Sequence, residues 1–200
     1  MEMNVLHPSP SNDRPHGQET PSGWVQRWSH LLRPGGTVLD VACGQGRHMA
    51  WFAGRGHPVT GIDRSPQALA AVTPWGVAVQ ADIENGPWPL LHEGVPQTFD
   101  AVVVTNYLWR PLLPRIRDSL APGGVLLYET FACGQDTVGK PSRPDFLLQP
   151  GELLQAFSGL RVVAYEDGYL ASPPRFVQRL AAVRAPAPLS TETAPPRYPL

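Results

Sequence analysis

One aspartate and two glycines in the first third of the chain have the types and spacing needed to bind a nucleotide-like ligand. Asp40 lies in the apolar run 38–41, which predicts a short buried strand, and Gly44 and Gly46 follow in a tight turn. Glycine accepts positive φ angles and, because it has no Cβ, lets a ligand come close to the backbone. Residues 47–53 are expected to form a helix, whose first N–H groups and positive dipole end favour a carboxylate or phosphate.

Two further aspartates narrow the choice of ligand. Asp63 follows the second apolar run, roughly 20 residues after Gly44, where an acid in a Rossmann-type site binds the hydroxyl groups of a ribose. Asp82 follows the third run, and a dinucleotide fold does not require an acid there. The third glycine of the dinucleotide fingerprint is also missing, because Met49 stands in its place. These positions favour a ligand without a pyrophosphate.

The elements that position these residues alternate between helical and strand patterns. We expect strands at 37–41, 57–62, 77–81, 99–105, 125–131, 161–169 and 176–184, and helices at 24–32, 47–53, from 66 onward, at 112–120 and at 151–157. The turn 171–174 is too short for a crossover helix, so the last strand must run antiparallel to the one before it. The sequence therefore predicts an α/β fold: a doubly wound, Rossmann-like, seven-stranded and mostly parallel sheet with an antiparallel last strand.

The whole chain has the size of one domain with two polar ends. It has 200 residues, of which 42% are hydrophobic, and the ends are proline-rich, so we predict a single folded domain at 23–184 between flexible tails at 1–22 and 185–200. A net charge of −1 without a basic run argues against a nucleic-acid or membrane partner. Two cysteines form neither a disulfide framework nor a zinc spacing, and no signal peptide or membrane span is visible, so a cytoplasmic location without a metal is expected.

Four segments in order resemble the successive motifs of class I S-adenosylmethionine-dependent methyltransferases. They are Asp40-Val41-Ala42-Cys43-Gly44-Gln45-Gly46, Gly61-Ile62-Asp63-Arg64-Ser65, Gln80-Ala81-Asp82-Ile83 and Phe99-Asp100-Ala101-Val102-Val103-Val104. The resemblance covers residues 31–184. Residues 105–108 and 146–154 also resemble small bacterial methyltransferases of the tellurite-resistance type. One position departs from the family pattern, because Ala42 replaces the first glycine of the turn.

The resemblance implies S-adenosylmethionine as the cofactor and gives each motif a role. Asp40 would orient the glycine turn and reach toward the amino acid part of the cofactor. Asp63 would accept hydrogen bonds from the ribose hydroxyls, since a carboxylate can accept two at once. Asp82 would accept from the adenine amino group while Ile83 packs on the ring. The resemblance puts the remaining cofactor contacts at Ala42, Gly44, Gly46, Arg64 and Asn106.

The acceptor would meet the methyl group at the end of the fourth strand, beside Asn106 and Tyr107. Methyl transfer mainly needs in-line positioning in a water-poor pocket, because the sulfonium is already a good leaving group. A hydroxyl or protonated amine would also need a base, for which Tyr107, Glu129 and His30 are candidates. A thiol or oxyanion would need none, and Arg110 and Arg143 would suit an anionic acceptor. We expect His48 to pack at the helix start.

Three functions remain open on the sequence alone. The first is methyl transfer to a small-molecule acceptor. The second is a nicotinamide-dependent Rossmann oxidoreductase, against which Met49 and Asp82 both argue. The third is a protein of the same fold that binds the cofactor without catalysis. Methylation of a nucleic acid is disfavoured, because residues 106–109 match poorly the tetrapeptide that holds a flipped base.

Overall fold

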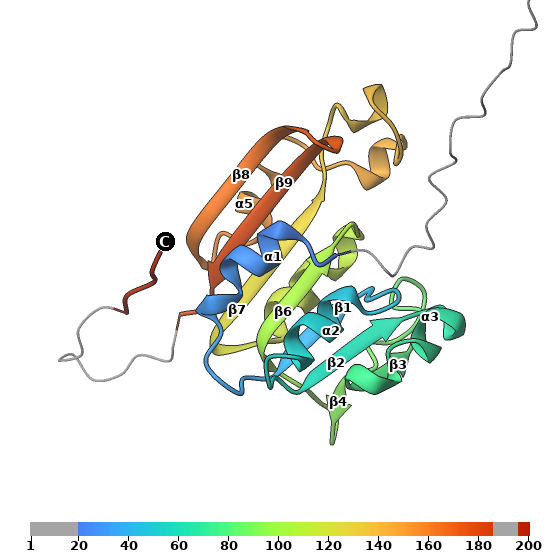
Figure 1. Cartoon of the computed structure of the whole chain (residues 1–200), viewed down its shortest axis with the longest axis vertical. Coiled ribbons are helices and arrows are strands. Elements are labelled where there is room, and N and C mark those ends of the chain that lie inside the picture. Colours follow the sequence, from blue (N-terminus) through green and yellow to red (C-terminus); the bar gives the residue numbers. More distant parts are fainter. Residues whose placement is uncertain (1–19, 186–195) are drawn as a thin grey trace, which may run out of the picture.

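The computed structural model describes residues 20–185 and 196–200, and one large sheet runs through the centre of the protein. Its seven strands lie in the order β3-β2-β1-β6-β7-β9-β8, as Figure 1 shows. Strand β9 pairs antiparallel with both neighbours, whereas the pairs among β3, β2, β1, β6 and β7 are parallel. The predicted fold, including its antiparallel last strand, is confirmed.

The sheet strands are β1 (Val38–Val41), β2 (Val59–Asp63), β3 (Val77–Gln80), β6 (Phe99–Thr105), β7 (Leu120–Phe131), β8 (Arg161–Ala171) and β9 (Pro174–Val183). The α-helices are α1 (Gly23–Trp28), α2 (Arg47–Ala53), α3 (Pro66–Ala70), α4 (Leu113–Asp118) and α5 (Glu152–Ala156). Single 3₁₀ turns lie at Ser29–Leu31, Thr73–Trp75, Arg110–Leu112, Gln135–Thr137 and Pro144–Phe146. A small hairpin of β4 (Leu91–His92) and β5 (Val95–Pro96) projects below the sheet, and the sequence did not predict it.

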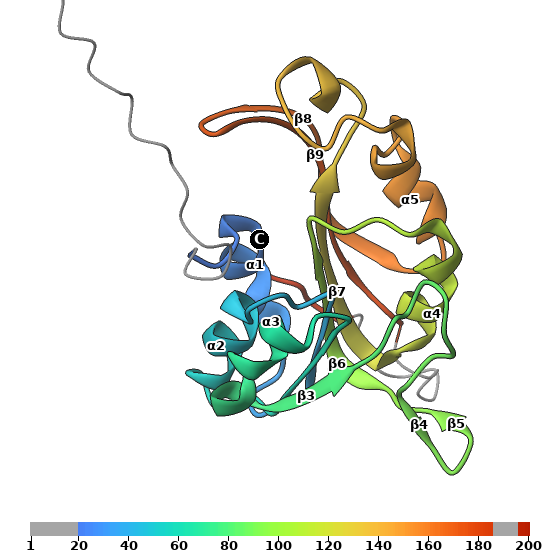
Figure 2. The same ribbon diagram turned by 90° about the vertical axis from the view of Figure 1, so that its right-hand side faces the viewer.

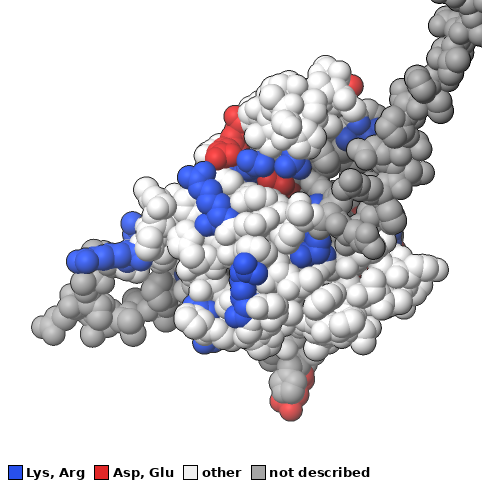
Figure 3. Space-filling model, viewed as in Figure 1, with Lys and Arg blue, Asp and Glu red and all other residues white. Residues whose placement is uncertain are grey.

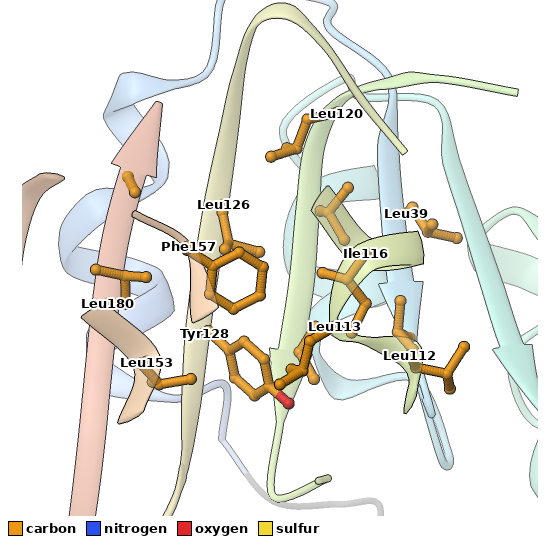
Figure 4. Packing of buried hydrophobic residues seen from close by; sticks show 14 of the residues in the cluster. Leu39, Leu112, Leu113, Ile116, Leu120, Leu126, Tyr128, Leu153, Phe157 and Leu180 are labelled. Carbon is orange, nitrogen blue, oxygen red and sulfur yellow. The ribbon is translucent and has the colours of Figure 1, made fainter. Parts of the chain in front are cut away.

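Helices cover both faces of the sheet, which therefore has two cores. Figure 2 shows α1, α2 and α3 on one face and α4 and α5 on the other. On the α4/α5 face, Tyr128 and Leu126 of β7 pack with Ile116 and Phe157 (Figure 4). On the α1/α2 face, side chains of the alternate strand positions pack with Trp28 and with the α2 residues Met49 and Phe52. Burial on both faces explains the nearly continuous apolar runs of β1 and β6.

Local sequence explains where several helices begin. The Ser65 side chain accepts a hydrogen bond from the Ala68 amide at 3.2 Å, and Pro66 occupies the first turn of α3. The Ser22 side chain accepts from the Trp24 amide at 3.1 Å in the same way, and so caps α1.

Two predicted helices are shorter than expected. The helix predicted at 24–32 is α-helical only to Trp28 and continues as one 3₁₀ turn. The helix predicted at 112–120 ends at Asp118, because Leu120 already belongs to β7 and pairs with Phe99. Residue 124 must be glycine for the chain to continue from this pair into the rest of β7. A Cβ at this position would lie 2.8 Å from the Ala121 carbonyl oxygen.

Most of the two predicted tails, 1–22 and 185–200, lies outside the described residues, so the division into tails and domain stays a prediction. Ser22 is buried against the sheet. At the other end the Arg161 guanidinium lies 5.3 Å from the centre of the Tyr198 ring, which packs against the α1/α2 core. None of the helices in the described ranges is long and apolar enough to cross a membrane.

Candidate cofactor site

A cavity of about 410 Å³ lies at the carboxyl ends of the parallel strands, within the range of small-ligand sites. It brings together seven of the predicted site residues: Ala42, Asp63, Arg64, Asp82, Ile83, Asn106 and Tyr107. The other lining residues are Ala81, Glu84, Leu108, Thr130, Phe131, Pro141 and Phe146. Asp40, Gly44, Gly46 and Glu129 are outside this lining, although the first three adjoin it through the glycine turn.

The turn after β1 has three residues in the left-handed region. Ala42, Gly44 and Gly46 have φ values of 55°, 53° and 79°. A Cβ on Gly46 would lie 2.5 Å from Val72 Cγ1, so this glycine is needed for packing between α2 and the loop after α3. A Cβ on Gly44 would meet nothing within 4 Å, which leaves its backbone open to a ligand. Ala42 therefore departs from the family pattern at a position where the backbone favours glycine.

Asp63 joins the glycine turn to the next loop. One carboxylate oxygen accepts from the Gly44 amide at 2.9 Å and the other from the Ser65 amide at 2.9 Å. A carboxylate has about four lone-pair sites, so two hydrogen bonds leave it able to accept more from the cavity side. The geometry fits a carboxylate that is fixed in place and still able to bind two neighbouring hydroxyl groups.

Asp82 shapes the loop that follows β3. Its oxygens accept from the amides of Glu84 (3.0 Å) and Asn85 (3.2 Å) and from the Asn85 side chain (2.9 Å). These hydrogen bonds, chiefly that of the Asn85 side chain, hold the pKa of Asp82 below its usual value. Asp82 is therefore ionised at neutral pH, and its loop presents Ile83 and Glu84 to the cavity.

Asp40 is buried behind the glycine turn. Among the described residues its Oδ2 atom has no hydrogen-bond partner. Burial is the main cause that raises the pKa of Asp40 to about 7; the charge of Arg47 opposes it, and the charge of Asp63 adds to it. A cationic group at the end of the turn would supply the missing partner for this oxygen and favour its ionised form.

Asn106 and Tyr107 follow β6 at the cavity wall. Asn106 has a φ of 54°, a conformation that Asn tolerates better than most residues, and its amide donates to the Glu129 carbonyl at 2.9 Å. The Tyr107 hydroxyl is buried without a hydrogen-bond partner among the described residues. Burial, and then the negative charge of Glu84, raise the pKa of Tyr107. The phenol therefore stays protonated and is poorly suited to act as a base.

The comparisons with known proteins agree with this geometry. Residues 38–124 match the family described as "Methyltransferase domain". The chain is also 33% identical over 122 residues to a tRNA U34 carboxymethyltransferase of Klebsiella pneumoniae, covering 56% of this chain and 36% of that protein. This chain carries a methyltransferase domain, matched over residues 38–124.

Solved structures of methyltransferases share the fold of this domain. TehB from Haemophilus influenzae aligns with a TM-score of 0.67 and 19% identity, over 82% of this chain and 62% of that one. Magnesium protoporphyrin IX methyltransferase from Synechocystis PCC 6803, solved with bound SAH, aligns with a TM-score of 0.61 and 15% identity, over 81% and 79% of the two chains. The chain spans between a third and about half of the length of the curated relatives that it matches first.

The methyltransferase domain holds Glu129, one of the predicted bases, away from the cavity. Glu129 is buried on the α1/α2 face, where Arg179 Nε donates to it at 2.6 Å and the Ser22 hydroxyl donates at 3.2 Å. His30 is exposed, and its ring lies 2.8 Å from the Arg27 carbonyl oxygen. Both groups are committed to contacts within the protein, and neither lines the cavity.

The two arginines predicted for an anionic acceptor are paired in the methyltransferase domain as well. Arg110 makes a bidentate pair with Glu152 at 2.6 and 2.9 Å and also donates to two backbone carbonyls. Arg143 donates to Asp145 at 2.9 Å. Arg64 is the predicted cationic residue that does line the cavity.

Sequence reasoning missed the apolar wall of the cavity. Leu108 and Phe131 adjoin strand ends, whereas Pro141 and Phe146 come from the loop 132–149. The sequence indicated that this loop would shape the acceptor pocket, but a Gly- and Pro-broken segment has no periodicity from which to choose its inward residues. Within the described part of the chain, no three His, Cys, Asp or Glu side chains are grouped to hold a metal.

Proposed function

We propose that this protein transfers the methyl group of S-adenosylmethionine to a small-molecule acceptor. The observation that supports it best is the single cavity wall shared by Asp63, Asp82 and Asn106, which come from the ends of three different strands. An acid after each of two neighbouring strands beside a glycine turn suits an adenosyl group better than a dinucleotide. The match of residues 38–124 to the methyltransferase family supports the same reaction.

The residues present fit this cofactor. Asp63 would accept from the ribose hydroxyls, Asp82 and Ile83 would hold the adenine, and the open backbone at Gly44 would admit the methionine part. The Oδ2 atom of Asp40, which has no hydrogen-bond partner in the described part of the chain, would pair with the amino group of the cofactor. When bound, the cofactor supplies a methyl group on a charged sulfur that leaves readily.

The remaining cavity wall supports a small acceptor with an apolar body. Phe131, Pro141, Phe146 and Leu108 line it, and such a wall would exclude water from the reacting atoms. A cavity of about 410 Å³ leaves little room beside the cofactor, so the acceptor would have to be small or enter only in part. In-line positioning by this wall would then provide most of the rate acceleration.

Proton transfer by the protein is poorly supported at this site. Tyr107 keeps its proton because its pKa is raised, and Glu129 is paired with Arg179 outside the cavity. We therefore propose Tyr107 as a hydrogen-bond donor that orients the acceptor. An acceptor that reacts without losing a proton first, such as a thiolate or an oxyanion, suits this arrangement best. A cytoplasmic location fits the two unpaired cysteines, Cys43 and Cys133.

Calorimetric titration separates binding of S-adenosylmethionine from the oxidoreductase function. S-adenosylmethionine should bind to the wild type and bind at least tenfold more weakly to Asp63→Asn, which loses one charged acceptor (about 1.4 kcal/mol or more). Tight binding of NAD instead would overturn the proposal in favour of an oxidoreductase. Asp118→Asn, an exposed aspartate at the end of α4, is the matched control and should bind like the wild type.

A donor-consumption assay then tests the acceptor. Thiols, oxyanions, amines, small acids and bulk tRNA are offered in turn with the donor, because relatives of this chain include enzymes named for tRNA. We expect turnover with a small molecule, and Phe146→Ala should raise KM for it more than it lowers kcat. Turnover with tRNA alone would contradict the small-molecule part of the proposal. Cofactor binding without turnover of any acceptor would favour the non-catalytic function.

A further inference from the structure

A cluster of four polar residues, three of them buried, lies beside the cofactor cavity on the α1/α2 face of the sheet. It consists of Ser22, just before α1, Asp40 on β1, His48 on α2 and Thr105 at the end of β6. Asp40 and His48 are 1% and 2% exposed. Thr105 directly precedes Asn106, and Asp40 lies two residues before Ala42, so the group adjoins two residues of the cavity wall.

Ser22 fixes the tautomer of His48. The Ser22 backbone amide lies 3.1 Å from His48 Nε2, and a backbone N–H can only donate. Nε2 must therefore accept, and a neutral imidazole then has its hydrogen on Nδ1. Burial lowers the pKa of His48 to about 3, with a further contribution from Arg47, so the ring is neutral at physiological pH. The sequence suggested only packing at this position.

The Nδ1–H group of His48 faces the Thr105 hydroxyl and the Asp40 carboxylate. Nδ1 is within hydrogen-bond distance of Thr105 Oγ1, at 3.5 Å, and lies 4.0 Å from Asp40 Oδ2, which has no hydrogen-bond partner among the described residues. A donor that faces a carboxylate favours its ionised form. The other charged groups near Asp40 are Arg47 on α2 and Asp63 on β2. Glu129 and Arg179 reach the same group through the Ser22 hydroxyl.

We infer that His48 is a positioning residue of the cofactor site, which uses its Nδ1–H group to favour the ionised form of Asp40 while Ser22 holds the ring. This inference rests on the proposed function, because Asp40 would pair with the amino group of the cofactor. It also implies that cofactor affinity depends on the hydrogen bond between the Ser22 amide and His48. Loss of the Ser22 contact frees the imidazole to change its tautomer and to turn its donor away from Asp40.

Two amide substitutions test the Nδ1 donor and the Nε2 acceptor of the imidazole one at a time. In His48→Asn the amide N–H can replace Nδ1–H, but the side chain is too short to accept from Ser22. In His48→Gln the amide oxygen can accept from Ser22, but the donor toward Asp40 is lost. Titration calorimetry with S-adenosylhomocysteine at pH 6 and pH 8 measures the affinity of both variants and of the wild type.

We expect the affinity of the wild type to rise with pH as Asp40 ionises. His48→Gln should raise the midpoint of this rise from about 7 to about 8, so that its binding is about ninefold weaker than that of the wild type at pH 6 and only about twofold weaker at pH 8. His48→Asn should keep the midpoint of the wild type. Asp40→Asn should bind weakly and independently of pH, which assigns the midpoint to Asp40.

Three results would overturn the inference. One is equal weakening of His48→Gln at both pH values, which indicates a structural defect, and another is an unchanged midpoint in that variant. The third does not depend on variants: ¹⁵N NMR of the wild-type imidazole should show a protonated Nδ1 and an unprotonated Nε2, and the opposite pattern contradicts the inference. A wild type that binds no cofactor would instead overturn the proposed function, and this inference with it.

Discussion

Ala42 occupies a backbone conformation that favours glycine. Its φ of 55° brings Cβ close to the following carbonyl oxygen, which costs an L-residue roughly 1–2 kcal/mol. The same methyl group lines the cofactor cavity. Ala42 therefore lowers the stability of the turn and narrows the space above it.

We predict that Ala42→Gly stabilises the protein by about 1 kcal/mol, because the gain from relieved strain exceeds the added freedom of the unfolded chain. Urea unfolding measures this change. Ala50→Gly is the matched control inside α2, where the same substitution should destabilise by about 0.5–1 kcal/mol. Destabilisation of similar size in both variants would show that Ala42 is not strained.

Asp40 makes stability depend on pH. Its pKa is raised by burial, so the folded state binds the proton more tightly than the unfolded chain does. This contribution to stability is full below about pH 4 and is lost as the pH rises through about 7. His48 acts in the opposite direction, because its lowered pKa gives a contribution that is present above its ordinary pKa and lost as the pH falls toward 3.

We therefore predict that Asp40→Asn gains stability relative to the wild type as the pH rises from 4 to 8, by on the order of 2 kcal/mol. Comparing the two proteins cancels the contribution of His48. Urea unfolding at intervals of one pH unit measures the difference. A constant difference across this range would mean that Asp40 has an ordinary pKa in the folded protein.

At the scale of elements, the loop 132–149 and helix α5, which both follow β7, have different roles. Phe157, directly after α5, is fully buried against the sheet beside Tyr128 at a ring-centre distance of 5.9 Å. Phe146 comes from the loop, is 37% exposed and lines the cavity. One aromatic residue thus fixes α5 in place, and the other forms part of the binding surface.

We predict that Phe157→Ala destabilises the protein by about 3–5 kcal/mol, because it leaves a cavity in a closed core. Phe146→Ala should change stability by no more than about 0.5 kcal/mol and instead affect the acceptor. Chemical unfolding of the two variants provides the comparison. A large loss from Phe146→Ala would show that the loop is part of the core.

Elements with a regular hydrophobic pattern could be predicted from the sequence. Side-chain pairs that depend on tertiary contacts could not. The runs 38–41 and 99–105 gave β1 and β6, because strands buried on both faces need continuous apolar residues. Asp63, Asp82 and Asn106 could be placed at the cavity because the carboxyl ends of parallel strands meet there. The pairing of Glu129 with Arg179 could not be predicted, since it depends on the register of β7 against β9.

At the scale of the whole molecule, one sheet with helices on both faces forms the fold. The stability of this fold should increase when the cofactor binds. A ligand that binds only the folded state at 100 times its Kd adds about 2.7 kcal/mol. For a chain of 200 residues this corresponds to a rise in Tm of roughly 5–10 °C. We predict such a rise with S-adenosylmethionine in a thermal-unfolding scan. NAD at the same concentration should cause none, and an equal rise with NAD would contradict the proposed cofactor.

On one face of the molecule, charged side chains are spread out rather than gathered in one patch. On the face shown in Figure 3 the Lys and Arg side chains lie apart from one another, between uncharged residues, and some adjoin acidic ones. Arg27 of α1 and Arg179 of β9 both pair with Glu166 of β8. The arrangement agrees with the formal charge of −1 and provides no continuous basic surface on this face for a nucleic-acid backbone.

The position of β9 between β7 and β8 has a consequence for the order of assembly. Strand β9 follows β7 and β8 along the chain, yet it lies between them in the sheet. During synthesis, the edge of β7 that will pair with β9 stays unpaired until residues 174–183 have left the ribosome. Only then can Arg179 neutralise Glu129 and β8 gain its partner, so the sheet is completed only after β9 has been synthesised.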